Sequence, residues 1–302
     1  MRVIRIITIV LGAAAIVMVG TQSQHTPPGL AAVVQAARTG CSKGSLRGNY
    51  GFQISGTIVG FGPIGGIALV TFDGEGNFTQ TDNVTVNGFP NVPANRPGSG
   101  TYDVNSDCTG TQTLNSGGQV SHTTFVLADN GKEVFDIVTN PSPPNPPNLV
   151  ITGVGKAVSS LDDNEEDDSS PFACSRETIK GSYATSTTGS IVFAGPVGAV
   201  ADVGKITFDG NGGASQTTAV SLNGVIIPSR SSLSGSYRVE EDCTGDISLI
   251  LPGPAGTITS TSRFVIVRNG EELLTLNSGV GRVLTGIATR QRAGRRFLLG
   301  HE

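Results

Sequence analysis

"SGTYDVNSDCTGT", residues 99–111, and "SGSYRVEEDCTGD", residues 234–246, are two versions of one segment. The likeness continues on both sides of it. Matched stretches include "CSKGSLRGNYGF" from Cys41 with "CSRETIKGSYAT" from Cys174, and "VTFDGEGNFTQTDNVTVNG" from Val70 with "ITFDGNGGASQTTAVSLNG" from Ile206. The offset of 133 residues between Cys41 and Cys174 far exceeds a solenoid unit, which has roughly 20 to 50 residues. The chain therefore contains one whole domain twice.

Changes in composition divide the chain into six predicted parts. Arg2 and Arg5 precede an apolar run, residues 6–19, which is the order of a secretory signal peptide. Retention of this run as a membrane anchor is the alternative; after its removal we expect no membrane span. The parts are a signal peptide (1–23), a flexible leader (24–40), β-barrel repeat 1 (41–158), an acidic linker (159–173), β-barrel repeat 2 (174–289) and a basic tail (290–302).

The charge of the chain argues against nucleic acid as a partner. The formal net charge is −4, and loss of Arg2 and Arg5 with the signal peptide makes it −6. This balance is the opposite of the basic surface that nucleic acid requires. Six of the seven positions from Asp162 to Asp168 are acidic, but they lack the spaced ligands and turn glycine of a calcium loop. We interpret this run as a solvated linker.

The four cysteines occupy matched positions, two in each repeat. In an exported protein the simplest pairing lies within each repeat, which predicts the disulfides Cys41–Cys108 and Cys174–Cys243. Closing loops of this length stabilises each repeat by about 4 kcal/mol on the chain-entropy model. The chain has no C-x-x-C motif, and its three histidines are scattered, so we predict no metal and no cofactor.

The local pattern is β throughout, with alternating β-branched residues and a turn signal every 8 to 14 residues. Turn pairs such as Asn87-Gly88 and Asn223-Gly224 favour sequential hairpins. The pattern predicts two tandem antiparallel up-and-down β-barrels of about eight strands each, with two β-sandwiches as the alternative. In the first repeat we expect strands at 49–59, 65–72, 77–87, 99–105, 109–115, 120–128, 132–139 and 149–158.

Comparison of the two copies indicates which strand face is buried. The positions of Val70 and Phe72 stay apolar in the second copy, whereas Leu69 on the other face becomes Lys205. A lysine in a filled core is costly, so Phe72 and its match Phe208 should point inward. Gln80 and Gln216 persist beside apolar positions of the next strand. Each is either a polar group that orients a ligand in the lumen or a solvated side chain near the hairpin.

All four tyrosines are matched as well, Tyr50 with Tyr183 and Tyr102 with Tyr237. Rings that close the barrel ends, with hydroxyls bonded to backbone, are one interpretation. Donation of a hydrogen bond to a ligand is the other, so all four are candidate ligand-binding residues together with Gln80 and Gln216.

At "LRGNYGF" and "IKGSYAT" the chain resembles the first strand of lipocalins and other calycin barrels, in which a helical turn leads into a G-x-W motif. Tyr50 and Tyr183 stand where that motif has tryptophan. The eight-stranded barrel of the allene oxide cyclase type is a second resemblance, based on strand count. Either resemblance implies a small apolar ligand in the lumen, with Tyr50 and Tyr183 closing one end.

The catalytic motifs of common hydrolases and nucleotide enzymes are missing from the sequence. There is no G-x-S-x-G elbow, Walker loop or H-E-x-x-H, and we name no catalytic residue. Recurring acids such as Asp73, Asp107, Asp209 and Asp242 fall in predicted turns, where backbone-bonded carboxylates are ordinary. We expect a secreted, non-catalytic protein that binds a small apolar ligand or an extracellular partner. An exported isomerase, cyclase or hydrolase and a structural surface or matrix protein are the alternatives.

Overall fold

The computed structural model describes residues 40–91, 93–139, 149–159, 173–193, 195–253 and 256–292. The predicted signal peptide lies outside these residues, as do the leader before residue 40, most of the acidic linker, the proline-rich stretch 140–148 and the tail after residue 292. Within the described part of the chain, no helix is both long enough and apolar enough to cross a membrane.

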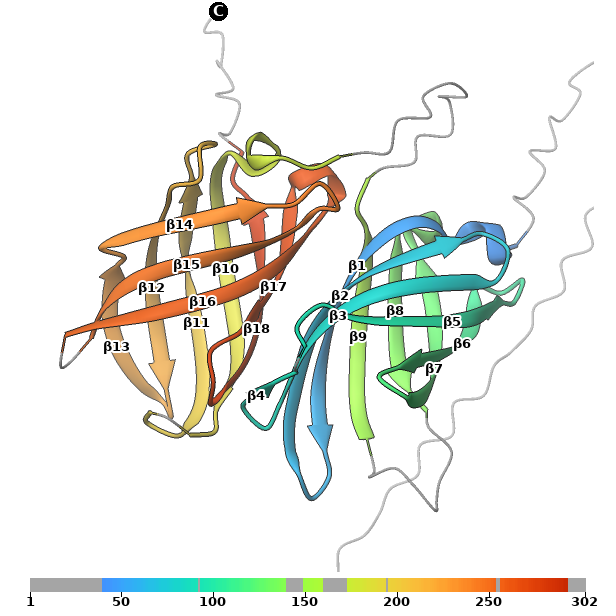
Figure 1. Ribbon diagram of the computed structural model, residues 1–302, viewed down its shortest axis with the longest axis horizontal. Coiled ribbons are helices and arrows are strands. Elements are labelled where there is room, and N and C mark those ends of the chain that lie inside the picture. The colour runs from blue at the N-terminus through green and yellow to red at the C-terminus, as the bar shows by residue number, and fades with distance from the viewer. Residues whose placement is uncertain are drawn as a thin grey trace, which may run out of the picture. The chain divides into compact units, whose positions relative to one another are not determined.

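The first repeat is a closed antiparallel barrel (Figure 1). Its strands follow one another around the barrel in chain order, and β1 pairs with both β2 and β9. The seam between β3 and β5 runs from Asn77↔Thr101 to Asp82↔Arg96. The strands are β1 (Arg47–Ile58), β2 (Gly62–Asp73), β3 (Asn77–Val86), β4 (Phe89–Pro90), β5 (Arg96–Val104), β6 (Thr109–Ser116), β7 (Gln119–Ala128), β8 (Glu133–Val138) and β9 (Leu149–Ala157).

The second repeat has the same strand succession but curls into a half-barrel. Strand β13 pairs with β12 along much of its length, from Thr217↔Ser231 to Leu222↔Val225. A β-bulge shifts the register of the two strands between Thr218 and Val220. As a result β12 and β14 meet only at the isolated bridge Gly213↔Ser236. The strands are β10 (Gly181–Ile191), β11 (Gly198–Phe208), β12 (Ala214–Leu222), β13 (Val225–Ser231), β14 (Ser234–Val239), β15 (Thr244–Gly253), β16 (Gly256–Val267), β17 (Glu272–Asn277) and β18 (Arg282–Arg290).

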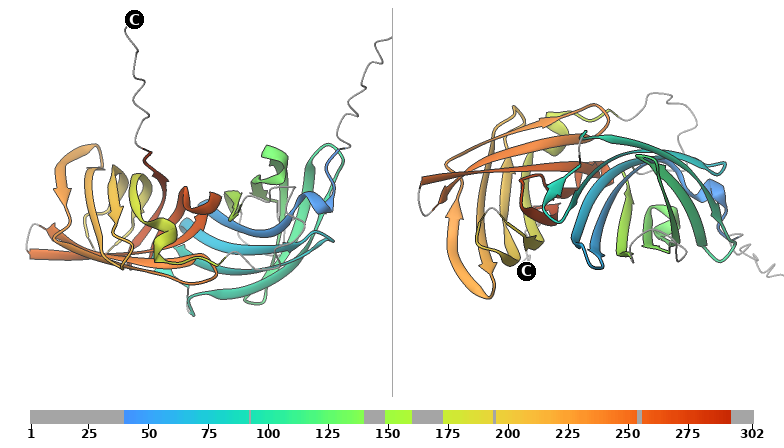
Figure 2. Two further views of the ribbon diagram at one scale, coloured as in Figure 1. Left: turned by 90° about the horizontal axis from the view of Figure 1, so that it is seen from above. Right: turned by 60° about the horizontal axis from the view of Figure 1, so that its bottom comes forward.

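The prediction of an all-β chain with two tandem barrel sheets is confirmed, and the sheets are strongly curved in both views of Figure 2. The sandwich alternative does not match this strand order. The eight strands expected in the first repeat are all present; the short strand β4 was not expected. The partly open seam of the second repeat differs from the expected full closure, because a longer β13 replaces the short β4 of the first repeat.

Asparagine-glycine pairs make the tight hairpins that the sequence predicts. Asn87-Gly88 joins β3 to β4, and Asn223-Gly224 joins β12 to β13. Asn87 and Asn223 have φ of 47° and 51°, and the glycines after them have 80° and 81°. Two successive positive φ angles are the requirement of a type I′ hairpin turn, which asparagine and glycine meet at least cost.

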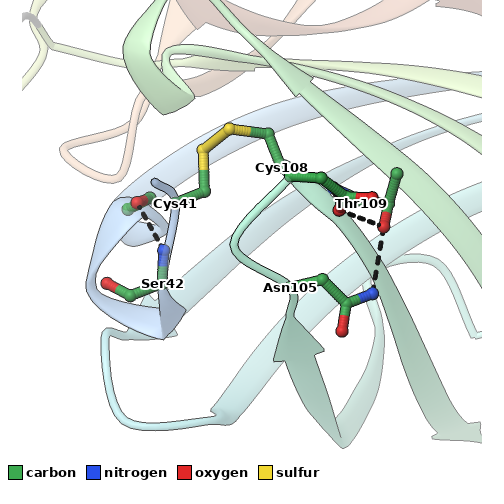
Figure 3. The surroundings of a disulfide bond; sticks show 7 residues. Cys41, Ser42, Asn105, Cys108 and Thr109 are labelled. Carbon is green, nitrogen blue, oxygen red and sulfur yellow. Dashed lines mark hydrogen bonds between the residues drawn. A yellow bond between two sulfur atoms is a disulfide. The ribbon is translucent and has the colours of Figure 1, made fainter. Parts of the chain in front are cut away.

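One end of each barrel is held by a disulfide. Cys41 bonds to Cys108 and Cys174 bonds to Cys243, as predicted, with Cα atoms 4.9 Å apart in both pairs. Figure 3 shows the first disulfide joining the segment before β1 to the turn between β5 and β6, where Asn105 donates to Thr109. The turn acids Asp107 and its match in repeat 2 accept the backbone N–H two residues later, as expected.

Candidate functional site: the lumen of the first barrel

The lumen of the first barrel is filled at its disulfide-bonded end. Phe72 lies at the centre of an aromatic cluster there, with its ring centroid 5.4 Å from that of Tyr50 and 5.1 Å from that of Tyr102. Burial of Phe72, and of Phe208 in the second repeat, confirms that both point inward. Rings at these edge-to-face distances leave little space between them, so this end forms a closed floor.

Beyond this floor the lumen is hollow. A cavity of about 340 Å³ lies within the barrel, lined mostly by inward-facing side chains of the strands. Its walls are mostly apolar: Phe52, Ile54, Ile58, Ile64, Ile67, Ala68, Val70, Phe78, Val84, Leu114, Val120, Val138, Leu149 and Ile151. The polar lining residues are Gln80, Asp82, Arg96, Gln112, Ser116, Gln119, Ser121, Thr123 and Asp136. An apolar cavity of this size with a few polar groups has the character of a small-molecule pocket.

A buried carboxylate is fully bonded on one wall of the cavity. Asp82, which is 4% exposed, accepts two hydrogen bonds of 3.0 Å from Nε and Nη2 of Arg96. Gln80 Nε2 donates to the same carboxylate at 2.9 Å, and Ser116 Oγ at 3.3 Å. Asp82 and Arg96 are direct partners across the β3–β5 seam. The pair therefore links the two strands that close the barrel, with its charges neutralised.

A second carboxyl, that of Asp136, has few partners. It faces inward from β8, between the positions of Val134 and Val138, and the N–H of Gly153 on β9 is its hydrogen-bond donor. Burial in the apolar lumen raises the pKa of Asp136 to about 6. A Cβ atom at position 153 would lie too close to Oδ1 of this carboxyl, so the carboxyl would have to move to accommodate any other residue there.

The tyrosines that the sequence singled out lie away from the cavity of the first barrel: neither Tyr50 nor Tyr102 lines it. Each of the four hydroxyls donates to the backbone: Tyr50 to Gly131 O, Tyr102 to Leu46 O with Lys43 O also in reach at 3.1 Å, Tyr183 to Gly270 O, and Tyr237 to Arg176 O. This agrees with the structural interpretation. Ligand binding by Tyr50, Tyr102, Tyr183 or Tyr237 stays a prediction that the geometry does not favour.

The two predicted glutamines have different surroundings. Gln80 lines the cavity, and its amide is held by Asp82. Gln216 occupies the matched position on β12, where it is half-buried and its backbone N–H donates to Ser232 Oγ at 3.0 Å. A role in ligand binding stays a prediction for both residues.

The remaining turn acids lie outside the lumen. Asp73 accepts hydrogen bonds from the N–H groups of Glu75, Gly76 and Asn77, and these bonds lower its pKa to about 2. Asp209 accepts two corresponding bonds in the second repeat. Both carboxylates are exposed turn stabilisers, as the sequence indicated.

Sequence reasoning missed Asp82, Arg96 and Asp136 as site residues. A usable signal was the alternation on β8, where the inward positions read Val134, Asp136 and Val138. A charged residue in such a series is informative, because it must be either paired or functional when buried. The pairing of Asp82 with Arg96 had no comparable signal, since it depends on the register across the barrel seam.

The second repeat has a different lumen. Asp202 on β11 also faces inward, and burial raises its pKa, but the hydroxyls of Thr187 and Thr218 donate to it. Thr275 stands at the position that matches Asp136, and Thr218 at the position that matches Asp82.

No family model matches the chain, and no curated protein is significantly similar to it.

Proposed function

We propose that this chain is an exported, non-catalytic binding protein that holds a small apolar molecule in the lumen of its first barrel. The observation that carries the proposal is the cavity of about 340 Å³ in a barrel whose other end is closed. Apolar walls supply the binding free energy, since transfer of apolar surface out of water is favourable, and the few polar groups orient the ligand.

The construction of the barrel supports binding in a preformed site. The disulfide, the aromatic floor and the Asp82–Arg96 pair all hold the wall in place whether or not the cavity is filled. A site that is ordered in advance loses less conformational entropy when the ligand enters. The calycin-like sequence around Tyr50 agrees with this use of a barrel.

Export is part of the proposal. Two disulfides are typical of proteins outside the reducing cytosol, and each repeat has its own. The predicted signal peptide supplies the route. The relevant ligand is then a molecule met in the periplasm or outside the cell.

Native mass spectrometry of the mature protein from its exporting host tests the proposal directly. A small molecule that accompanies the folded protein and is released on denaturation is the expected result. Binding in the lumen is then located with two neighbouring variants of β8, titrated with the apolar fluorophore N-phenyl-1-naphthylamine. Val138→Phe fills the cavity and should weaken binding at least tenfold, whereas Ile137→Phe places the same phenyl ring on the outward face, where Ile137 is 47% exposed.

Equal binding by both variants would place the fluorophore elsewhere and contradict lumen binding. An empty protein that also fails to bind the fluorophore would favour the structural surface or matrix protein instead. Contact with an extracellular partner is compatible with either result.

An exported isomerase or cyclase is the second candidate, and one observation favours it. A carboxyl with a pKa near 6 in an apolar cavity is suited to general acid and base catalysis near neutral pH. Chemical conversion of the released molecule by wild type, and its loss in Asp136→Asn, would establish this candidate over simple binding.

A further inference from the structure

The charge balance of the first lumen is uneven. The ionisable side chains that line the cavity are Asp82, Arg96 and Asp136. Asp82 and Arg96 neutralise each other through two hydrogen bonds of 3.0 Å. Arg96 is the basic side chain among the lining residues, and it is paired with Asp82 and not with Asp136. The cavity therefore carries one net negative charge whenever Asp136 is ionised.

The surroundings of Asp136 leave its charge poorly solvated. The residue lies on β8 opposite Gly153 of β9, and the side chain of Ile54 lies close to that glycine. Ile151, the next inward residue of β9, is 5% exposed. One backbone N–H cannot replace the shell of water that an ionised carboxylate loses on burial. A cation placed against this carboxylate would supply the missing partner.

An anionic ligand would meet the opposite situation. Arg96 is the cationic side chain of the cavity, and its Nε and Nη2 atoms are already engaged by Asp82. A carboxylate ligand would have to share the remaining N–H groups of Arg96 beside the negative Asp82, or break this pair and leave the buried Asp82 without its counter-ion. It would also be repelled by Asp136.

We propose that the first lumen selects an amphipathic cation: a small apolar molecule with one protonated amine, which is received by the carboxylate of Asp136. The apolar part lies against Ile54, Val84 and Ile151, and the ammonium group donates to Asp136. This inference rests on the proposed lumen-binding function and adds the chemical class of the ligand. Burial raises the pKa of Asp136 to about 6, and a bound ammonium would lower it again by stabilising the ionised form.

Three probes with the same alkyl chain test the charge preference: octylamine, 1-octanol and octanoate. Each is used to displace N-phenyl-1-naphthylamine from the full mature protein at pH 7.5. We expect octylamine to displace the fluorophore at a concentration at least tenfold lower than 1-octanol, and octanoate to be the weakest of the three.

Variants assign the preference to Asp136. Asp136→Asn keeps the size of the side chain. It should lower the affinity for octylamine at least tenfold while changing the affinity for 1-octanol less than twofold. Asp136→Thr, which copies Thr275 of the second repeat, should do the same. The matched control is Asp202→Asn, which removes the buried carboxyl of the other lumen and should leave the affinities for all three probes unchanged.

A change of pH gives a second readout. Lowering the pH from 7.5 to 5 protonates Asp136 but leaves the amine charged, so octylamine should bind more weakly at pH 5 in wild type and equally at both pH values in Asp136→Asn. Equal affinity for the three probes in wild type would overturn the cation preference and leave lumen binding intact. Failure of the fluorophore to bind at all would instead overturn the proposed function.

Discussion

In both repeats a tyrosine of the first strand donates to the glycine of an Asn-Gly turn: Tyr50 to Gly131, and Tyr183 to Gly270. The disulfides of the two repeats also span the same Cα separation of 4.9 Å. The closed ends of the two sheets are thus built in one way. This common end contains the cystine, the aromatic rings and the buried hydroxyls, all of which stabilise the domain.

The lumens of the two repeats show no such agreement. Matched inward positions change from Phe52 to Thr185, from Ile54 to Thr187, from Gly66 to Asp202, from Asp82 to Thr218 and from Asp136 to Thr275. Each lumen keeps a carboxyl with a raised pKa, but on a different strand and with different donors. A barrel with a fixed floor can therefore hold different chemistry above it, and the differences mark the residues that function would use.

Removal of the disulfides tests the likeness of the closed ends, and it should have the largest effect. We expect Cys41→Ala/Cys108→Ala and Cys174→Ala/Cys243→Ala to lower the free energy of unfolding of their own repeat by about 4 kcal/mol each, because the closed loops are nearly equal in length. Urea denaturation with hydrogen exchange read by mass spectrometry distinguishes the repeats. Simultaneous opening of both repeats in either variant would contradict the expectation that each disulfide stabilises only its own repeat.

The barrel seams should respond unequally. Arg96→Ala leaves Asp82 buried without a counter-ion and should cost about 3 kcal/mol, near the lower end for a broken buried pair because Arg96 is partly exposed. In repeat 2 the residue paired with Thr218 is Arg230 of β13, whose Nη1 donates to Pro252 O. Arg230→Ala should therefore cost only about 1 kcal/mol in urea denaturation.

A double variant separates charge from packing at the first seam. Asp82→Thr in the Arg96→Ala background introduces the residue found at position 218 of the second repeat and removes the stranded charge, so it should recover most of the lost stability. Equal losses for Arg96→Ala and Arg230→Ala would show that the two seams are held in the same way. No recovery in the double variant would show that the loss in Arg96→Ala does not come from a stranded charge.

The sequence was sufficient for the fold because each hairpin carries local signals. Asn87 and Asn223 readily adopt the positive φ that a tight turn demands, and the period-2 alternation fixes which face of each strand is inside. The unequal closure had no local signal. It depends on the length of β13 and a bulge near Thr218, which are set by pairing between strands and not by the residues of one strand.

The candidate site was only partly predictable. Gln80 was found because it persists between the copies at an inward position. Asp136 could not be found by recurrence, because this carboxyl is replaced by threonine in the second copy. The cavity itself results from the sum of side-chain volumes across several strands, and no single stretch of sequence reports that sum.

The smallest expected effect is the pH dependence that Asp136 adds to the free energy of unfolding of the first repeat. A carboxyl with a pKa of 3.8 in the unfolded chain and about 6 in the folded barrel binds its proton more tightly when folded, so stability falls as the pH rises through this interval. Between pH 5 and pH 7.5 this site should cost wild type about 1.4 kcal/mol in urea denaturation. Asp136→Asn should lack this part of the slope.

Asp107→Asn is the control. The Thr109 hydroxyl holds the pKa of Asp107 below its usual value, so the contribution of Asp107 to stability is lost only at lower pH. Between pH 5 and pH 7.5 the stability of this variant should therefore have the slope of wild type. An unchanged slope in Asp136→Asn would mean that the carboxyl is solvated when folded, and the two lumens would then differ in shape but not in charge.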